Sequence, residues 1–278
     1  MSTILVPTDY SPAAANATEY AASLAKRFKS EVFLFHSFHV PFMESEVHLE
    51  GYTPAELQLE HESALQAIAA GISSKYGVAV SFKATMGFAA DTIIEEEKHA
   101  NLVVMGMKAY TGAGKILGSI ATSVLKRTKK PLLIIPEKSA YKDPENVVLA
   151  CDEKAGTNEH PINTLKNFLK PFRTSIHVLN IRPVGDTAPE KDKMKKRLND
   201  NLQGSHLFYH FFENENLVET LSEFVSEHHA DMMAIIPHHY HILDRLFHKS
   251  VSREMAFTSG IPLLALPETQ SEGHVYFF

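Results

Sequence analysis

Three segments from the first half of the chain recur in the second half in the same order. The matched pairs are ILVPTD (4–9) with VVLACD (147–152), HANLVVMGM (99–107) with HADMMAIIP (229–237), and KPLLIIPE (130–137) with IPLLALPE (261–268). Three matches in one order indicate an internal duplication. A chain of 278 residues is long enough for two domains of ordinary size. We therefore expect two copies of one fold.

A polar linker with a proline, SAYKDPE at 139–145, separates the two copies. We expect one domain at 1–138, a second at 145–268 and a tail at 269–278. The first match is displaced by 143 residues (4 to 147) and the second by 130 (99 to 229). The second copy is therefore shorter by about a dozen residues, and we expect the deletion in the 39–53 connection and the helix after it.

Short apolar runs alternate with helical segments that carry recognisable caps. Ser11-Pro12 predicts an N-cap with proline in the first turn, for a helix ending near Phe28. Thr53-Pro54-x-Glu56 is a capping box for a helix that ends near Lys75. The expected strands are 4–6, 32–35, 78–84, 102–105 and 132–135. The predicted fold class is α/β, with two tandem doubly wound domains that each hold a five-stranded, mainly parallel sheet flanked by helices.

The stretch 101–137 combines strand, glycine-bearing loop, helix and strand. Gly106 directly follows the apolar run 102–105, and Ser119 can cap a helix with Ile120, Val124 and Leu125 on one face. The loop between them carries Gly112, Gly114 and Gly118. Glycines let the backbone approach an anion, and backbone N–H groups at a helix start point toward it. This pattern favours phosphate binding.

Composition excludes several classes of protein. A net charge of -6 gives no reason to expect nucleic-acid binding. The single cysteine, Cys151, rules out an internal disulfide framework and fits a reducing cytosol; we interpret it as a buried filler. No apolar run approaches the roughly 20 residues that span a bilayer, and the N-terminus does not read as a signal peptide. We expect a soluble, cytoplasmic protein without membrane or nucleic-acid partners.

The segment ILVPTDYSP at the start and the MG…TG…GS loop before SIATSVLKRTKKPLLIIP resemble the universal stress protein family in its tandem form. The resemblance covers nearly the whole chain. It implies an adenine-nucleotide α-hydrolase-like fold with five-stranded parallel sheets, and dimerisation is common in the family. Some members bind ATP at the carboxyl ends of the strands and others do not. The ATP-binding members carry Gly-x2-Gly-x9-Gly-Ser/Thr.

Mapped onto that pattern, Gly106 is the first glycine and Gly118-Ser119 the last pair, but Ala109 occupies the second position and the spacing to Gly118 is one residue short. Gly112 or Gly114 can take over the turn. The resemblance also implies that Asp9 contacts ribose or adenine and that adenine lies near His36 and Ser37. The candidate site for ATP or ADP with Mg²⁺ is Pro7, Thr8, Asp9, Ser37, Met105, Gly106, Gly112, Gly118, Ser119 and Ile120. A helix-start aspartate that complements the helix dipole is the alternative interpretation of Asp9, and the favoured one for Asp152.

The second copy lacks this loop chemistry. Alignment back from the final strand places Lys249 on Gly118 and Ser250 on Ser119, and no glycine occurs between Ile236 and Lys249. We expect no nucleotide site of the family type there, and a scaffold, dimerisation or regulatory role instead.

Two sharper motifs do not hold. The GAGK segment at 112–115 is not a Walker A loop, because Met107, Ala109 and Ile116 occupy positions that need glycine or Ser/Thr. Histidines crowd the region around 238–248; they are His228, His229, His238, His239, His241 and His248. Consecutive histidines point in different directions and no cysteine or carboxylate completes a set, so zinc is not expected. A solvated loop, or one that titrates near pH 6 to 7, is favoured.

No paired carboxylates, metal triad or activated nucleophile stands out, so an enzyme is not expected beyond slow ATP hydrolysis. Two hypotheses remain. One is a stress-response protein that binds ATP in its N-terminal domain. The other is a dimerising scaffold or protein-interaction module without nucleotide. In either case the duplication predicts an intramolecular pseudo-dimer of the two domains, and a homodimer of the whole chain is a further expectation.

Overall fold

The computed structural model describes residues 2–39, 53–108, 119–152, 154–182, 191–214, 216–236 and 260–268. The strands are β1 (Thr3–Pro7), β2 (Glu31–Phe38), β3 (Val80–Met86), β4 (Leu102–Met107), β5 (Leu132–Pro136), β6 (Asn146–Ala150), β7 (Ser175–Arg182), β8 (His206–Glu213), β9 (Met232–Ile235) and β10 (Leu263–Ala265). The helices are α1 (Pro12–Phe28), α2 (Pro54–Tyr76), α3 (Ala89–Glu96), α4 (Ser119–Arg127), α5 (Glu159–Leu169), α6 (Lys191–Asn201) and α7 (Leu217–Glu227).

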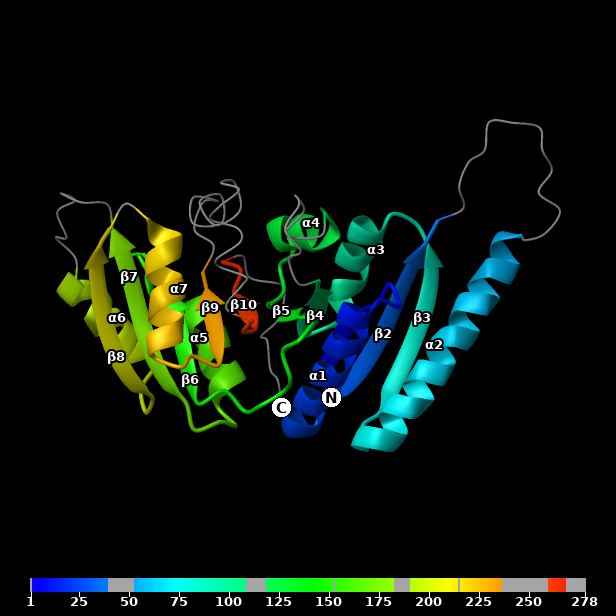
Figure 1. Cartoon of the computed structure of the whole chain (residues 1–278), viewed down its shortest axis with the longest axis horizontal. Helices are drawn as coiled ribbons and strands as arrows, with labels where there is room; N and C mark the ends of the chain where they lie inside the picture. Colours follow the sequence, from blue (N-terminus) through cyan, green and yellow to red (C-terminus); the bar gives the residue numbers. More distant parts are fainter. Residues whose placement is uncertain are drawn as a thin grey trace.

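The ten strands form one continuous sheet in the order β3-β2-β1-β4-β5-β10-β9-β6-β7-β8 (Figure 1). Within each half the strands are parallel, and their spatial order is third, second, first, fourth, fifth. The halves meet where β5 pairs antiparallel with β10. The predicted α/β fold class with two mainly parallel five-stranded units is confirmed. The sequence did not indicate that the two sheets share an edge.

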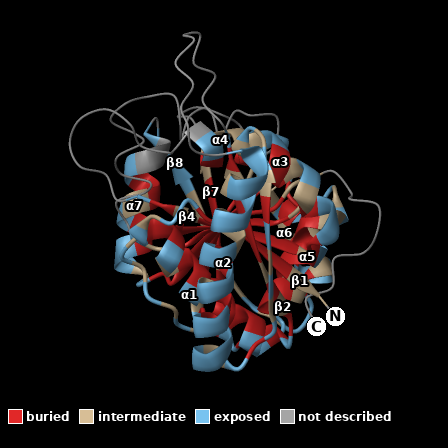
Figure 2. Cartoon of the chain, turned by 90° about the vertical axis from the view of Figure 1, so that its right-hand side faces the viewer, coloured by how far each residue is buried: buried red, intermediate tan, exposed pale blue. Residues whose placement is uncertain are grey.

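Helices cover both faces of the sheet and close two hydrophobic cores, each of which runs through both halves. Helices α1, α2, α5 and α6 pack on one face, and α3, α4 and α7 on the other. Figure 2 shows buried residues concentrated in the strands and on the inner helix faces, with exposed residues on the outer faces. The near-continuous apolar strands predicted this double cover, because a strand buried on both faces needs no polar alternation.

The helix caps predicted at Ser11 and Thr53 are present, whereas Ser119, also predicted as a cap, is already the first residue of α4. Ser11 accepts a hydrogen bond from the backbone of Ala14, and proline occupies the first turn of α1. The capping box at Thr53 and Glu56 is complete, and α2 ends at Gly77 with φ +69°. A 3-10 turn (Glu97–His99) follows α3 directly. None of the helices in the described ranges is both long and apolar enough to cross a bilayer.

The strand registers reproduce the sequence repeat. Ile4 pairs with Leu102 in the first half, and Val147 pairs with Met232 in the second. Helix α2 has 23 residues and its counterpart α6 has 11. This difference agrees with the expected deletion around the second helix. The domain limits 1–138 and 145–268 stay a prediction, and the tail 269–278 lies outside the described residues.

Candidate functional site

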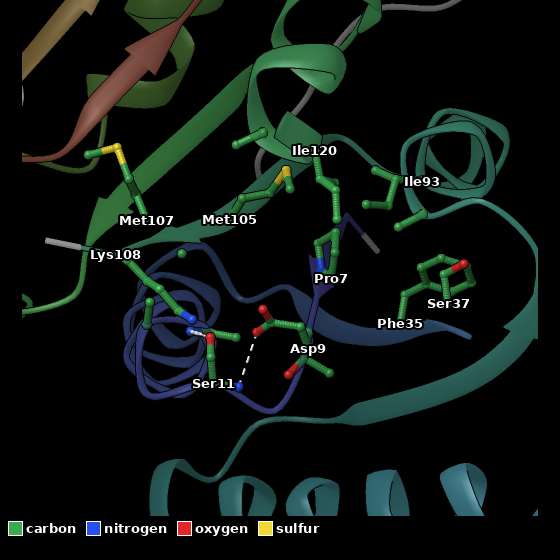
Figure 3. A pocket seen from close by; sticks show the side chains of 16 residues that line it. Pro7, Asp9, Ser11, Phe35, Ser37, Ile93, Met105, Met107, Lys108 and Ile120 are labelled. Carbon is green, nitrogen blue, oxygen red and sulfur yellow. Dashed lines mark hydrogen bonds between the residues drawn. The ribbon is translucent and has the colours of Figure 1, made fainter. Parts of the chain in front are cut away.

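A pocket of about 370 Å³ opens in the first half at the carboxyl ends of β1 and β4 (Figure 3). Strand β1 is followed by β2 on one side, whereas β4 lies on its other side. The chain therefore leaves neighbouring strands in opposite directions here, and the diverging connections leave a crevice. Open α/β sheets bind their ligands at such a switch point. A volume of this size suits a small organic ligand.

Gly106 determines how closely α1 approaches β4. A Cβ atom at this position would lie 2.2 Å from the carbonyl oxygen of Ala13 and 2.8 Å from the nitrogen of Ala14. Only glycine allows this contact, which brings the first turn of α1 to the edge of the pocket. Close packing of α1 on β4 therefore explains why glycine occupies position 106 without reference to a ligand. The backbone of Gly106 also lines the pocket.

Asp9 is exposed on the loop between β1 and α1, where its Oδ1 atom accepts a hydrogen bond from the backbone N–H of Ser11 at 3.0 Å. Partial burial acts to raise the pKa of Asp9. The hydrogen bonds from the side chain and backbone of Ser11 and the charge of Lys108 outweigh this effect, so the pKa lies below its ordinary value. The ammonium group of Lys108 points toward Ser11 and Asp9 in Figure 3. The pocket therefore presents one ionised carboxylate and one ammonium group near the start of α1.

His36 supports the wall of the pocket from behind. Its Nδ1 atom lies 2.8 Å from the carbonyl oxygen of Thr8, which can only accept, so Nδ1 carries the proton. The ring centroids of Tyr10 and His61 lie 4.5 and 4.4 Å from that of His36. Burial lowers the pKa of His36. The neighbouring Ser37 lines the pocket and donates to the carbonyl of Gly87 at 2.8 Å.

The structure places seven of the ten candidate residues around this pocket: Pro7, Thr8, Asp9, Ser37, Met105, Gly106 and Ile120. Ser119 starts α4, while Gly112 and Gly118, with Ala109 and Gly114, lie outside the described residues. Ile120, predicted on one helix face with Val124 and Leu125 and also in the candidate site, is 41% exposed and borders the pocket, whereas Val124 and Leu125 are buried. The first turn of α4 therefore lies at the opening of the pocket, and the next turn packs in the core.

Sequence reasoning missed several lining residues: Ser11, Phe35, Ala89, Ile93, Met107 and Lys108. A signal existed for Lys108, because it directly follows a buried strand at the edge where ligands bind. No comparable signal marks Ala89 and Ile93, since the approach of α3 depends on its packing against α4.

The second half keeps the same switch point with different contents. Cys151 and Leu179 repeat the backbone hydrogen bond of Thr8 and Phe35, and Asn180 donates to the Cys151 carbonyl at 3.0 Å, as His36 does to Thr8. Ile236 occupies the position of Gly106 and is buried in the core. Helix α5 starts only at Glu159, seven residues after Asp152, whereas α1 starts three residues after Asp9.

Asp152 and Cys151 follow the first strand of the second half. The Oδ1 atom of Asp152 accepts a hydrogen bond from the backbone of Lys154 at 2.9 Å, in a turn seven residues before α5. The prediction that Asp152 complements the dipole at a helix start is therefore wrong, because Asn158 caps the helix instead. Cys151 is buried and burial raises the pKa of its thiol to about 12, as expected for a filler. The segment around Lys249 and Ser250 lies outside the described residues.

Comparisons with known proteins agree with this architecture. The family model for the universal stress protein family matches residues 1–136. A universal stress protein of Methanocaldococcus jannaschii is 32% identical over 137 residues, which are 48% of this chain and 80% of that protein. The crystal structure of a universal stress protein from Archaeoglobus fulgidus covers 96% of this chain and 98% of its own, with a TM-score of 0.76 and 17% identity. A Pseudomonas aeruginosa structure assigned to the same family has a TM-score of 0.55 and 14% identity, covering 96% of this chain and 93% of its own. The two solved structures show the fold, and the archaeal relative, together with the family match, shows that this chain belongs to the universal stress protein family.

Proposed function

We propose that this protein binds an adenine nucleotide, ATP or ADP, in the pocket of its first half and acts as a nucleotide-responsive stress protein. The observation that carries the proposal is the pocket at the β1–β4 switch point, bordered by the first turn of α1 and the bare backbone of Gly106. Helix N-termini favour anions, and a glycine lets the backbone come close to them.

Different residues of the pocket lining suit the base, the ribose and the phosphate groups of a nucleotide. Apolar side chains that suit a base come from four different elements: Phe35, Ile93, Met105 and Ile120. The Asp9 carboxylate suits the ribose hydroxyl groups as a hydrogen-bond acceptor. Lys108 suits a phosphate as a point charge.

The same lining argues against rapid chemistry. Among the described residues around the pocket, Asp9 is the one carboxylate and Lys108 the one ammonium group. A fast hydrolase needs a positioned base or a metal cluster in addition to charge stabilisation. Binding, with slow Mg²⁺-dependent hydrolysis at most, therefore fits these groups best.

We also propose that the two halves act as an intramolecular pseudo-dimer. The antiparallel pair of β5 and β10 relates two units of identical strand order, which is the arrangement expected for an interface between equivalent subunits. Formation of this pair occupies one sheet edge of each unit within the chain.

Site-directed variants test the nucleotide proposal. Lys108→Ala should weaken ATP binding about tenfold, or about 1.4 kcal/mol, and leave adenosine binding unchanged, because only ATP carries phosphate. Asp9→Asn should weaken the binding of both ATP and adenosine, because an amide is a poorer hydrogen-bond acceptor for ribose hydroxyl groups than a carboxylate. Isothermal titration calorimetry measures both effects.

The matched control is Lys26→Ala, which removes an exposed lysine from the last turn of α1. It should leave both affinities unchanged. Unchanged ATP affinity in Lys108→Ala and in Asp9→Asn would exclude the proposed site. A wild-type protein without any nucleotide affinity would favour the scaffold hypothesis.

A further inference from the structure

Three histidines converge in the second half, away from the nucleotide pocket. His177 lies on β7, His210 on β8, and His228 is the C-cap residue of α7. One ring nitrogen from each lies within 4.8 Å of the others, and all three side chains are partly buried. Strands β7 and β8 and helix α7 lie side by side at the outer end of the sheet in Figure 1.

The strand pairing explains why the first two meet. In the parallel pair of β7 and β8, His177 stands opposite Phe208 and Leu179 opposite His210. Residues two apart on a strand share a face, so His177 and His210 are diagonal neighbours on one face of the sheet. The Nδ1 atom of His177 lies 3.2 Å from the Nε2 atom of His210.

Helix α7 brings the third ring to the same face. The ring centroid of His228 lies 5.1 Å from that of His177 and 5.1 Å from that of His210. Its Nδ1 atom lies 3.1 Å from the backbone carbonyl of Phe224, which accepts the Nδ1 proton. The lone pair of His228 is therefore on Nε2. A backbone carbonyl that fixes the tautomer in this way is the usual outer-shell partner of a histidine that binds metal.

Stacked phenyl rings hold two of the imidazoles in place. The ring centroids of Phe224 and His228 lie 3.8 Å apart with an interplanar angle of 19°. Those of Phe208 and His177 lie 5.1 Å apart with an angle of 21°. Burial also lowers the pKa values of His177 and His210, which favours the neutral form at neutral pH. Neutral imidazole is the form that coordinates metal ions.

We propose that His177, His210 and His228 form a Zn²⁺ site that joins the edge strand β8 and strand β7 to helix α7. Three imidazoles suit zinc, whereas Mg²⁺ and Ca²⁺ require oxygen ligands. Two nitrogens bound to one tetrahedral zinc at the usual bond length lie about 3.3 Å apart. The His177–His210 separation of 3.2 Å is close to that value. With three protein ligands, the fourth position is open to water or an anion.

The alternative is a purely structural cluster, in which the hydrogen bond between His177 and His210 and the aromatic stacking satisfy the rings without metal. The two interpretations differ in whether the metal-free protein takes up zinc with a defined stoichiometry. The sequence also offers other histidines at 238–248, which the experiment must separate from the cluster.

The test is a competition titration of metal-free, full-length protein with Zn²⁺ and a chromophoric chelator, followed by Co²⁺ substitution. We expect one tightly bound zinc per chain, and visible absorption of the Co²⁺ protein typical of a tetrahedral site. His210→Gln should weaken zinc binding at least about 100-fold, because an amide replaces one of three ligands. His177→Gln and His228→Gln should act in the same way.

The control is His206→Gln, which changes an exposed histidine on the same strand β8 and should leave zinc affinity unchanged. A combined variant of His238, His239, His241 and His248 should also retain the site. Absence of stoichiometric zinc uptake by the wild-type protein would overturn the proposal. So would uptake that survives His210→Gln but disappears in the combined variant. Circular dichroism of each variant separates loss of the site from loss of folding.

Discussion

The two halves of this protein share strand order, register and switch-point hydrogen bonds, and differ at one decisive position. Gly106 in β4 and Ile236 directly after β9 occupy corresponding positions. The sequence repeat and the registers of β4 with β1 and of β9 with β6 both show this. Gly106 lets α1 start close to β4, whereas Ile236 is 2% exposed and packs in the core. Both halves therefore keep the switch point. A helix can begin close to the fourth strand only in the first half, where the residue at this position is glycine and has no side chain.

Other positions keep one structural role in both halves with different residues. The side chain of Asn101 accepts a hydrogen bond from the backbone of Thr3 at 3.0 Å. Its counterpart Asp231 accepts from Asn146 at 3.0 Å and from Glu145 at 2.8 Å. Each pair joins the loop before the fourth strand to the start of the first. These polar side chains therefore support the backbone of the fold.

The largest expected effect comes from placing the residue of the second half into the first. Gly106→Ile should reduce the free energy of unfolding by about 3 kcal/mol, because even its Cβ atom would overlap the backbone of Ala13. The displaced start of α1 should also abolish nucleotide binding. Urea unfolding and ATP titration measure the two effects.

The control for this variant is Gly71→Ala, in the exposed middle of α2, where an added Cβ atom has no heavy atom within 4 Å. It should raise stability by about 0.5–1 kcal/mol, because alanine favours helix. If Gly106→Ile were as stable as the wild type, the close contact with Ala13 would not constrain the first half.

A smaller effect should distinguish the supporting side chains. Asp231→Ala should lower the free energy of unfolding by about 2 kcal/mol, because it leaves two backbone N–H groups without their acceptor and removes the ion pair with Lys142. Asn101→Ala should cost about 1 kcal/mol, since one N–H is affected. Urea unfolding of both variants measures the difference. Equal costs would show that the second N–H bond and the ion pair add nothing in the second half.

The smallest effect concerns pH. Burial keeps the pKa of His36 below that of the unfolded chain, so its contribution to stability is present above pH 6.5 and is lost as pH falls through the folded pKa. Asn180 makes the corresponding hydrogen bond without titrating. His36→Asn should therefore make the free energy of unfolding change less between pH 7.5 and pH 5 than in the wild type.

The reciprocal variant, Asn180→His, introduces a titratable ring at the corresponding buried position. It should make stability fall more steeply over the same pH interval. Urea unfolding at a series of pH values checks both variants. An unchanged pH profile in His36→Asn would show that His36 is protonated equally in the folded and unfolded chains.

Much of the fold could be predicted because its signals are local. The buried strands are short apolar runs, and the caps at Ser11, Thr53 and Gly77 use residues whose chemistry is specific to helix ends. The repeat then predicted that the second half has the same fold as the first. Most candidate residues around the pocket came from the resemblance to the universal stress protein family, whose ATP-binding members bind the nucleotide at the carboxyl ends of the strands.

The remaining features depend on residues that are distant in sequence. The β5–β10 pair joins two strands that are both covered on each face, and an apolar run does not reveal which edge it pairs with. The histidine cluster was missed because His177, His210 and His228 come from three elements, whereas the visible signal was the run of histidines near 238–248. Likewise, the close contact of Gly106 with Ala13 follows from tertiary packing. From the sequence, Gly106 was interpreted only as part of a phosphate-binding loop.

The two copies of the fold should differ in nucleotide binding, with a site in the first half and none in the second. Calorimetric titration of ATP with Mg²⁺ into the wild-type chain, after a check for nucleotide retained through purification, tests it most directly. We expect one site per chain, with an affinity that Lys108→Ala weakens. Two sites per chain would contradict the contrast drawn between Gly106 and Ile236, and no site at all would contradict the proposed function of the first half.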